Sequence, residues 1–82
     1  MKKVPVASRK TVDHFNRAIE VSKKIGATGL LGLAYLDLGM FYKSKKETDQ
    51  ARACLSEAIR IFEENGAEIY LTQAKEALAS LG

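Results

Sequence analysis

The chain has 82 residues, of which 46% are hydrophobic and 28% charged, and its formal net charge is +3. This length accommodates one domain, and this composition is typical of a globular chain rather than a disordered one. The single cysteine, Cys54, excludes an intramolecular disulfide and fits a reducing compartment. No secretory leader and no run of about 20 apolar residues is recognisable, so we expect a cytoplasmic protein.

Apolar residues recur at helical spacing along most of the chain, and no segment alternates with the period of a strand. We therefore expect an all-α protein of about four helices, preceded by a flexible N-terminal tail of residues 1–7. The expected helices cover residues 8–25, 28–44, 48–65 and 67–81.

Glycine and short polar residues indicate where these helices end and begin. Gly26 and Gly66 are expected in the left-handed conformation that closes a helix, which glycine adopts at little cost. Side-chain oxygens commonly cap the first turn of a helix. The candidate caps are Ser8 or Thr11 for the first helix, Thr28 for the second, and Thr48 or Asp49 for the third.

The sequence resembles itself after a shift of forty residues. "FNRAIEVSKKIGA", which starts at Phe15, aligns with "LSEAIRIFEENGA", which starts at Leu55. The helix-ending glycine stays in register, so two unrelated amphipathic helices do not explain the match, and we expect a structural repeat. The matched small or apolar positions are Ala18 with Ala58, Ile19 with Ile59, Gly26 with Gly66, Ala27 with Ala67, Leu31 with Leu71, Ala34 with Ala74, and Leu38 with Leu78.

Residues 32–65 resemble one tetratricopeptide (TPR) repeat. The positions that carry the resemblance are Tyr35, Leu38, Gly39 and Tyr42 in its first helix and Ala51, Leu55 and Ala58 in its second. Two positions depart from the family pattern, because Lys46 stands at the usual turn glycine and Glu63 at the usual closing proline. The resemblance implies an α-solenoid of antiparallel helix-turn-helix repeats over residues 8–82, with one complete repeat flanked by half repeats.

The C-terminal part, "IFEENGAEIYLTQAKEALASLG", also resembles the C-terminal repeats of large bacterial signalling ATPases and cyclases. This second resemblance is looser than the first. It implies a role as the end of an interaction domain in signalling rather than an activity of its own.

The helix expected over residues 28–44 is apolar on nearly every side. One stripe is expected to pack on the first and third helices, beside Gly32 and Gly39, which leave room for a neighbouring backbone. That stripe consists of Leu31, Ala34, Tyr35, Leu38 and Tyr42.

Leu33, Leu36 and Met40 lie on the opposite side of the same helix. In the TPR architecture this side lines a concave groove that binds partners, with Lys43 as the one basic residue of the lining. Two interpretations compete: the fourth helix or the N-terminal tail covers these side chains, or another chain does. Their burial is worth roughly 5 to 8 kcal/mol, about as much as the total stability of so small a domain.

An array of about two repeats is short for a solenoid, which favours association. The expected partner is a protein, either a peptide or amphipathic helix or a second copy of the chain. We expect a symmetric homodimer with Leu33, Leu36 and Met40 buried between the chains or beside exchanged helices. The copies would dock groove to groove or exchange a terminal helix pair, with the turn at Lys46 as the hinge.

No catalytic, metal or cofactor site is recognisable. His14 and Cys54 occupy equivalent positions of the repeat, but a metal needs three or four ligands and the chain has no further Cys or His. We therefore expect neither an enzyme nor a cofactor. The alternative function is binding to nucleic acid or another anionic surface through Lys2, Lys3, Arg9, Lys10 and the lysines of residues 43–46. The aliphatic lining of the expected groove favours a protein partner over nucleic acid or a membrane.

Overall fold

The computed structural model describes residues 6–81, and all regular structure within them is helical. The four helices are α1 (Val6–Ile25), α2 (Thr28–Ser44), α3 (Thr48–Asn65) and α4 (Glu68–Ala79). The expectation of an all-α protein with four helices is confirmed. α1 begins at Val6, two residues before the expected start of the first helix, and residues 1–5 of the expected tail lie outside the described part. The last helix is also shorter than expected at both ends.

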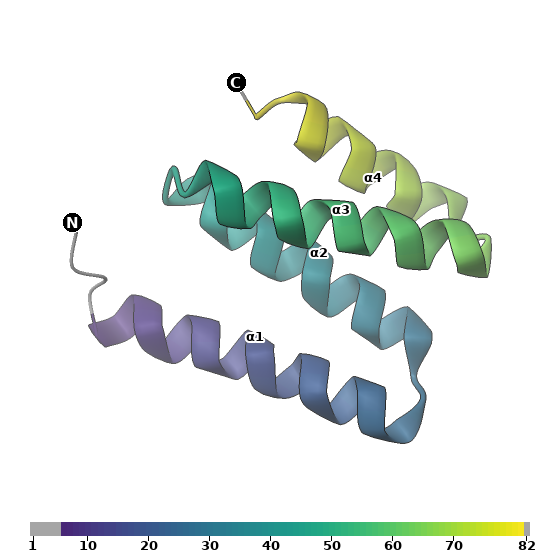
Figure 1. The fold of residues 1–82 in the computed structure, drawn as a ribbon, viewed down its shortest axis with the longest axis horizontal. Helices are drawn as coiled ribbons and strands as arrows, with labels where there is room; N and C mark the ends of the chain where they lie inside the picture. Colours follow the sequence, from purple (N-terminus) through teal and green to yellow (C-terminus); the bar gives the residue numbers. More distant parts are fainter. Residues whose placement is uncertain (1–5, 82) are drawn as a thin grey trace.

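The helices run back and forth, and each one packs against the next along the chain. As Figure 1 shows, α1 and α4 lie on opposite sides of the central pair formed by α2 and α3. Besides these sequential contacts, α2 also approaches α4. The result is a flat body with extents of 38 × 31 × 15 Å.

The three turns between the helices have the same geometry at intervals of twenty residues. Gly26, Lys46 and Gly66 are left-handed, with φ angles of 70°, 61° and 66°. After each of them, the next backbone N–H reaches back to a helix carbonyl five residues earlier, at N···O distances of 2.9, 2.9 and 3.0 Å. This pattern is the Schellman motif, and it confirms the expected role of both glycines. Lys46 adopts a conformation that is unfavourable for a side chain with a Cβ.

The expected side-chain caps of α2 and α3 are wrong. The N-cap residues are Ala27 for α2 and Glu47 for α3, and neither makes a side-chain capping hydrogen bond. The turns are so short that the residue after the left-handed Gly26 or Lys46 is itself the N-cap of the next helix. Both of these N-cap residues are half-buried. Thr28 instead donates a hydrogen bond from Oγ1 to Oδ1 of Asn65, 3.0 Å away, and joins the start of α2 to the end of α3. Ser8 and Thr11 lie within α1, because that helix begins at Val6.

Two clusters of buried side chains form the core. The first lies between α1 and α2 and is centred on Ile19, Ala34 and Leu38, with Phe15, Leu31 and Tyr42 packed against it. The second joins α2, α3 and α4. Its buried members are Leu36, Leu55, Ala58, Phe62, Ala74 and Ala77.

The contact between α2 and α3 depends on two glycines in α2. A Cβ on Gly32 would lie 2.6 Å from Cε1 of Phe62, and a Cβ on Gly39 would lie 2.8 Å from Cδ2 of Leu55. Both distances are far below a normal carbon–carbon contact, so only glycine lets the side chains of α3 approach the α2 backbone this closely. The close approach expected at Gly32 and Gly39 is therefore present, and α3 is the helix that makes it.

Candidate protein-binding groove

The residues that carry the TPR resemblance lie at the contacts between helices. Leu38, Ala51, Leu55 and Ala58 are buried. Gly39 lies against Leu55, and the two tyrosines, Tyr35 and Tyr42, are half-buried between helices. These residues therefore contribute to the packing of the helices on one another.

The residues expected to bind a partner do not behave as one group. Leu36 is only 6% exposed and belongs to the core cluster shared with α4, and Leu33 packs against the same cluster. For Leu36 the expectation of an open contact surface is wrong, and the alternative of coverage by the fourth helix is right. The physical reason is that Ala74 and Ala77 are small, so α4 approaches α2 closely enough to cover it.

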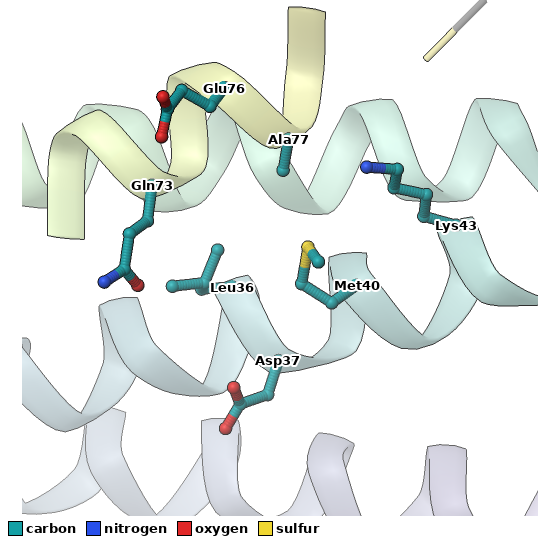
Figure 2. Close-up of a pocket in the computed structure, with 7 residues that line it drawn as sticks. All are labelled: Leu36, Asp37, Met40, Lys43, Gln73, Glu76 and Ala77. Atoms are coloured by element: carbon teal, nitrogen blue, oxygen red, sulfur yellow. The ribbon is translucent and has the colours of Figure 1, made fainter. Parts of the chain in front are cut away.

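Met40 and Lys43 remain accessible in a groove between α2 and α4. This groove has a volume of about 410 Å³ and is lined by Leu36, Asp37, Met40, Lys43, Gln73, Glu76 and Ala77. Figure 2 shows Leu36 and Met40 pointing from α2 toward α4, with Ala77 facing them from the other side. Asp37 points away from α4. The floor of the groove is thus apolar, and charged residues of both signs stand at its rim.

The contribution of α4 to this groove was not expected from the sequence. Gln73 and Glu76 of α4 are both exposed and line the groove. Ala77 also lines the groove and is nearly buried. The available signal was the spacing of Ala74 and Ala77, which places two small residues on one face of α4.

Two lysines near the groove contact the chain itself. Lys43 donates a hydrogen bond from Nζ to Oγ of Ser80, which ties the end of α2 to the end of α4. The Nζ atom of Lys45 lies 5.6 Å from the centre of the Phe41 ring, a cation–π distance. Neither contact supplies a negative charge, so the lysines of residues 43–46 keep their positive charge at this turn. Lys2 and Lys3, which the nucleic-acid alternative also uses, lie outside the described residues.

The main ionic network lies on the exposed side of α3, away from the groove. Arg60 bonds to Glu57 and, at 3.0 Å, to Glu64, which are three and four residues away on the same helix. Its hydrogen bonds lower the pKa of the Glu57 carboxyl, and the two carboxylates raise the pKa of the guanidinium. Such exposed pairs on one helix support that helix only weakly, because water screens them.

His14 and Cys54 do not form a reactive pair. His14 is exposed on α1, where its ring meets the edge of Phe15 at 6.1 Å between centroids. Cys54 is half-buried against the α1–α2 cluster, and burial raises the pKa of its thiol, so little reactive thiolate forms near neutral pH.

Among the described residues, no three His, Cys, Asp or Glu side chains gather as a metal ion would require. In the same part of the chain, no helix is long and apolar enough to cross a membrane. No protein-family model matches the chain, and comparisons with curated proteins and with solved structures give no match either.

Proposed function

We propose that this chain is a non-catalytic protein–protein interaction module with a TPR-like helical repeat architecture. The observation that carries the proposal is the groove between α2 and α4, whose apolar floor is bordered by Lys43 and Glu76. We also propose that the protein is located in the cytoplasm, whose reducing environment suits the free thiol of Cys54.

The helix contacts support a solenoid. Sequential helices pack on one another, and α2 and α4, which are alternate helices of the chain, approach each other on one side. In an array of helix pairs this side is concave, because the first helices of successive repeats line it. Leu36 and Met40 lie on this side of α2, where the groove opens.

The chemistry of the groove fits a short amphipathic helix or an extended peptide. Met40 is the accessible apolar residue of the groove, above the nearly buried Leu36 and Ala77, and a partner helix or peptide would place an apolar side chain against it. Lys43 and Glu76 supply charges of opposite sign, which would select the orientation of a partner that carries charges on its flanks. Met40 suits this role because its flexible thioether side chain adapts to different partner shapes.

A photo-crosslinking amino acid at position 40, introduced in the cell, tests this proposal. The matched control carries the same amino acid at position 69, because Ile69 is also an exposed apolar residue but lies on α4 outside the groove. We expect a discrete protein adduct at position 40 that is absent at position 69 and that Lys43→Glu weakens. Equal labelling at both positions would show that the groove is not a binding site.

Nucleic-acid binding is the second candidate, because the chain is basic, with a net charge of +3. Binding through lysines depends strongly on salt, so fluorescence anisotropy with generic duplex and single-stranded probes distinguishes the two functions. We expect no measurable binding near physiological salt. Micromolar binding that is lost when Lys43, Lys45 and Lys46 are replaced by Glu would favour this second candidate over the groove.

A further inference from the structure

The turn between α2 and α3 combines a left-handed backbone with a residue that disfavours it. Among residues 6–81, Lys46 is the one non-glycine residue with a positive φ, whereas glycine stands at the corresponding positions of the other two turns, Gly26 and Gly66. In a residue with a Cβ this conformation brings the Cβ too close to the following carbonyl oxygen, a contact that glycine avoids. The closed turn at Lys46 is therefore less stable than its two counterparts.

The sequence at this turn also favours the alternative, in which the helix continues. Residues 43–48, "KSKKET", contain no glycine or proline, and lysine and glutamate are good helix formers. No side chain caps the start of α3, so the N–H groups of its first turn have no partner within the helix. In a continuous helix the carbonyl groups at the end of α2 would accept these hydrogen bonds. Opening of the turn therefore replaces a strained backbone by regular helix.

A single chain cannot open this turn without losing its core. The contact between α2 and α3 is the most extensive contact between helices in the described part of the chain. It includes the close approach of Phe62 to Gly32 and of Leu55 to Gly39. A continuous helix over residues 28–65 would be about 57 Å long and would carry its two halves apart. The open form therefore requires a second copy of the chain, whose α3 packs on this α2.

We propose that the turn at Lys46 opens and that two copies of the chain exchange halves. In this dimer α2 and α3 form one continuous helix in each copy, and the two long helices run antiparallel about a twofold axis. The contacts of α1 with α2 and of α3 with α4 stay within one copy, whereas α2 contacts α3 and α4 of the other copy. Every contact between helices of the monomer is thus reproduced, so the closed and exchanged forms differ chiefly at the hinge.

Exchange also makes the groove a site shared by the two copies. Met40 and Lys43 line it from α2, and Gln73 and Glu76 line it from α4. In the exchanged dimer the α2 and α4 of one groove come from different copies, so each dimer holds two complete grooves. The hydrogen bond between Lys43 and Ser80 likewise becomes a contact between copies. The exchange itself does not depend on what the groove binds.

Size-exclusion chromatography with light scattering, after refolding from urea at micromolar and at millimolar concentration, tests whether the dimer forms. The unmodified chain should have a mass of 9.0 kDa at the low concentration and show an additional fraction of twice that mass at the high one. Because exchange requires α2 and α3 to separate, the dimer should revert to monomer only slowly after dilution. A chain that stays monomeric under all these conditions overturns the proposal.

A pair of cysteines across the contact between α2 and α3 distinguishes exchange from docking of closed monomers. Thr28 and Asn65 are exposed and joined by a hydrogen bond of 3.0 Å, at the end of this contact that is far from the hinge. In a Cys54→Ala background, Thr28→Cys with Asn65→Cys should be linked by a short bismaleimide between two chains in the dimer and within one chain in the monomer. The matched control is Glu63→Cys with Lys75→Cys, at an ion pair of 4.0 Å between α3 and α4, which should be linked within one chain in both forms. A dimer in which the first pair is also linked within one chain overturns the exchange.

Two substitutions of Lys46 test the hinge. Lys46→Gly relieves the left-handed turn of the monomer and weakens the continuous helix of the dimer, and each dimer contains two hinges, so the dissociation constant should rise about a hundredfold or more. Lys46→Ala is the matched control, because it removes the same charge but keeps the Cβ and a high helix propensity, and its dimer fraction should be equal or larger. Equal loss of the dimer in both variants overturns the proposed hinge. Loss of the dimer in Lys46→Gly without loss of photo-crosslinking at position 40 would leave the proposed function intact.

Discussion

Gly39→Ala should destabilise the protein although alanine is the better helix former. A Cβ at this position would lie 2.8 Å from both Cγ and Cδ2 of Leu55 and 3.3 Å from Cβ of Cys54. Leu55 is fully buried and has no space to withdraw, so α2 and α3 must move apart. Overpacking of this kind costs about 1 to 3 kcal/mol, and the helix propensity of alanine offsets about 1 kcal/mol of that.

Gly29→Ala, in the same helix, is the matched control. A Cβ there meets nothing within 4 Å, so the substitution should increase the free energy of unfolding by about 0.5 to 1 kcal/mol. The propensity gain is common to both variants, and the difference between them isolates the packing cost of about 1 to 3 kcal/mol. That difference is a large fraction of the roughly 4 to 12 kcal/mol expected for a chain of this length.

Urea denaturation followed by circular dichroism at the helix band measures both variants against the unmodified chain. Gly39→Ala should lower the transition midpoint and Gly29→Ala should raise it, with unchanged slopes. If both substitutions stabilise the chain equally, α3 does not pack on the α2 backbone at Gly39, and the arrangement of the central pair described above is wrong.

Three further predictions concern the turn at Lys46, the core at Ala58 and the titration of the half-buried Cys54 thiol. Lys46→Gly should stabilise the chain by about 1 kcal/mol in the same denaturation assay, because residue 46 is left-handed with a φ of 61°, and a loss of stability would show that the turn is open in solution. Ala58→Leu should cost about 1 to 3 kcal/mol because Ala58 is fully buried between helices, whereas Lys75→Leu on the exposed side of α4 should leave the unfolding midpoint nearly unchanged. Equal damage from both would contradict the helix register. Burial raises the pKa of the Cys54 thiol, so the folded state binds a proton that the unfolded state has released. The contribution of this thiol to the free energy of unfolding should therefore be fully present below the ordinary thiol pKa of about 8.5. It should be lost as the pH rises through the higher pKa that the thiol has in the folded state. In Cys54→Ala this decline should be smaller, and an identical pH profile would refute the assignment.

The sequence by itself determined the helices and most of their ends. Helical spacing of apolar residues predicted four helices, and the register of Gly26 and Gly66 predicted two of the three left-handed turns and the repeat. These features depend on local interactions, because a helix and its terminal turn are set by residues a few positions apart. At the third turn the sequence departs from the TPR pattern, because Lys46 stands where glycine is usual. The left-handed conformation of Lys46 does not follow from the sequence.

Only the tertiary structure decided which sides of α2 are covered. When a helix is apolar on nearly every side, its sequence does not indicate which side packs against which neighbouring helix. Leu36 and Met40 are therefore expected to belong to one stripe, although Leu36 is buried and Met40 is exposed. The distinction depends on how closely α4 approaches α2, and the small residues at that contact, Ala74 and Ala77, lie 38 and 41 residues after Leu36 in the chain. The same holds for Val21, which is apolar like its repeat equivalent Ile61: only the packing of α2 on the second pair leaves Val21 exposed and Ile61 buried. Sequence periodicity specifies which residues share a face, whereas the helix that covers each face is chosen by contacts between distant segments.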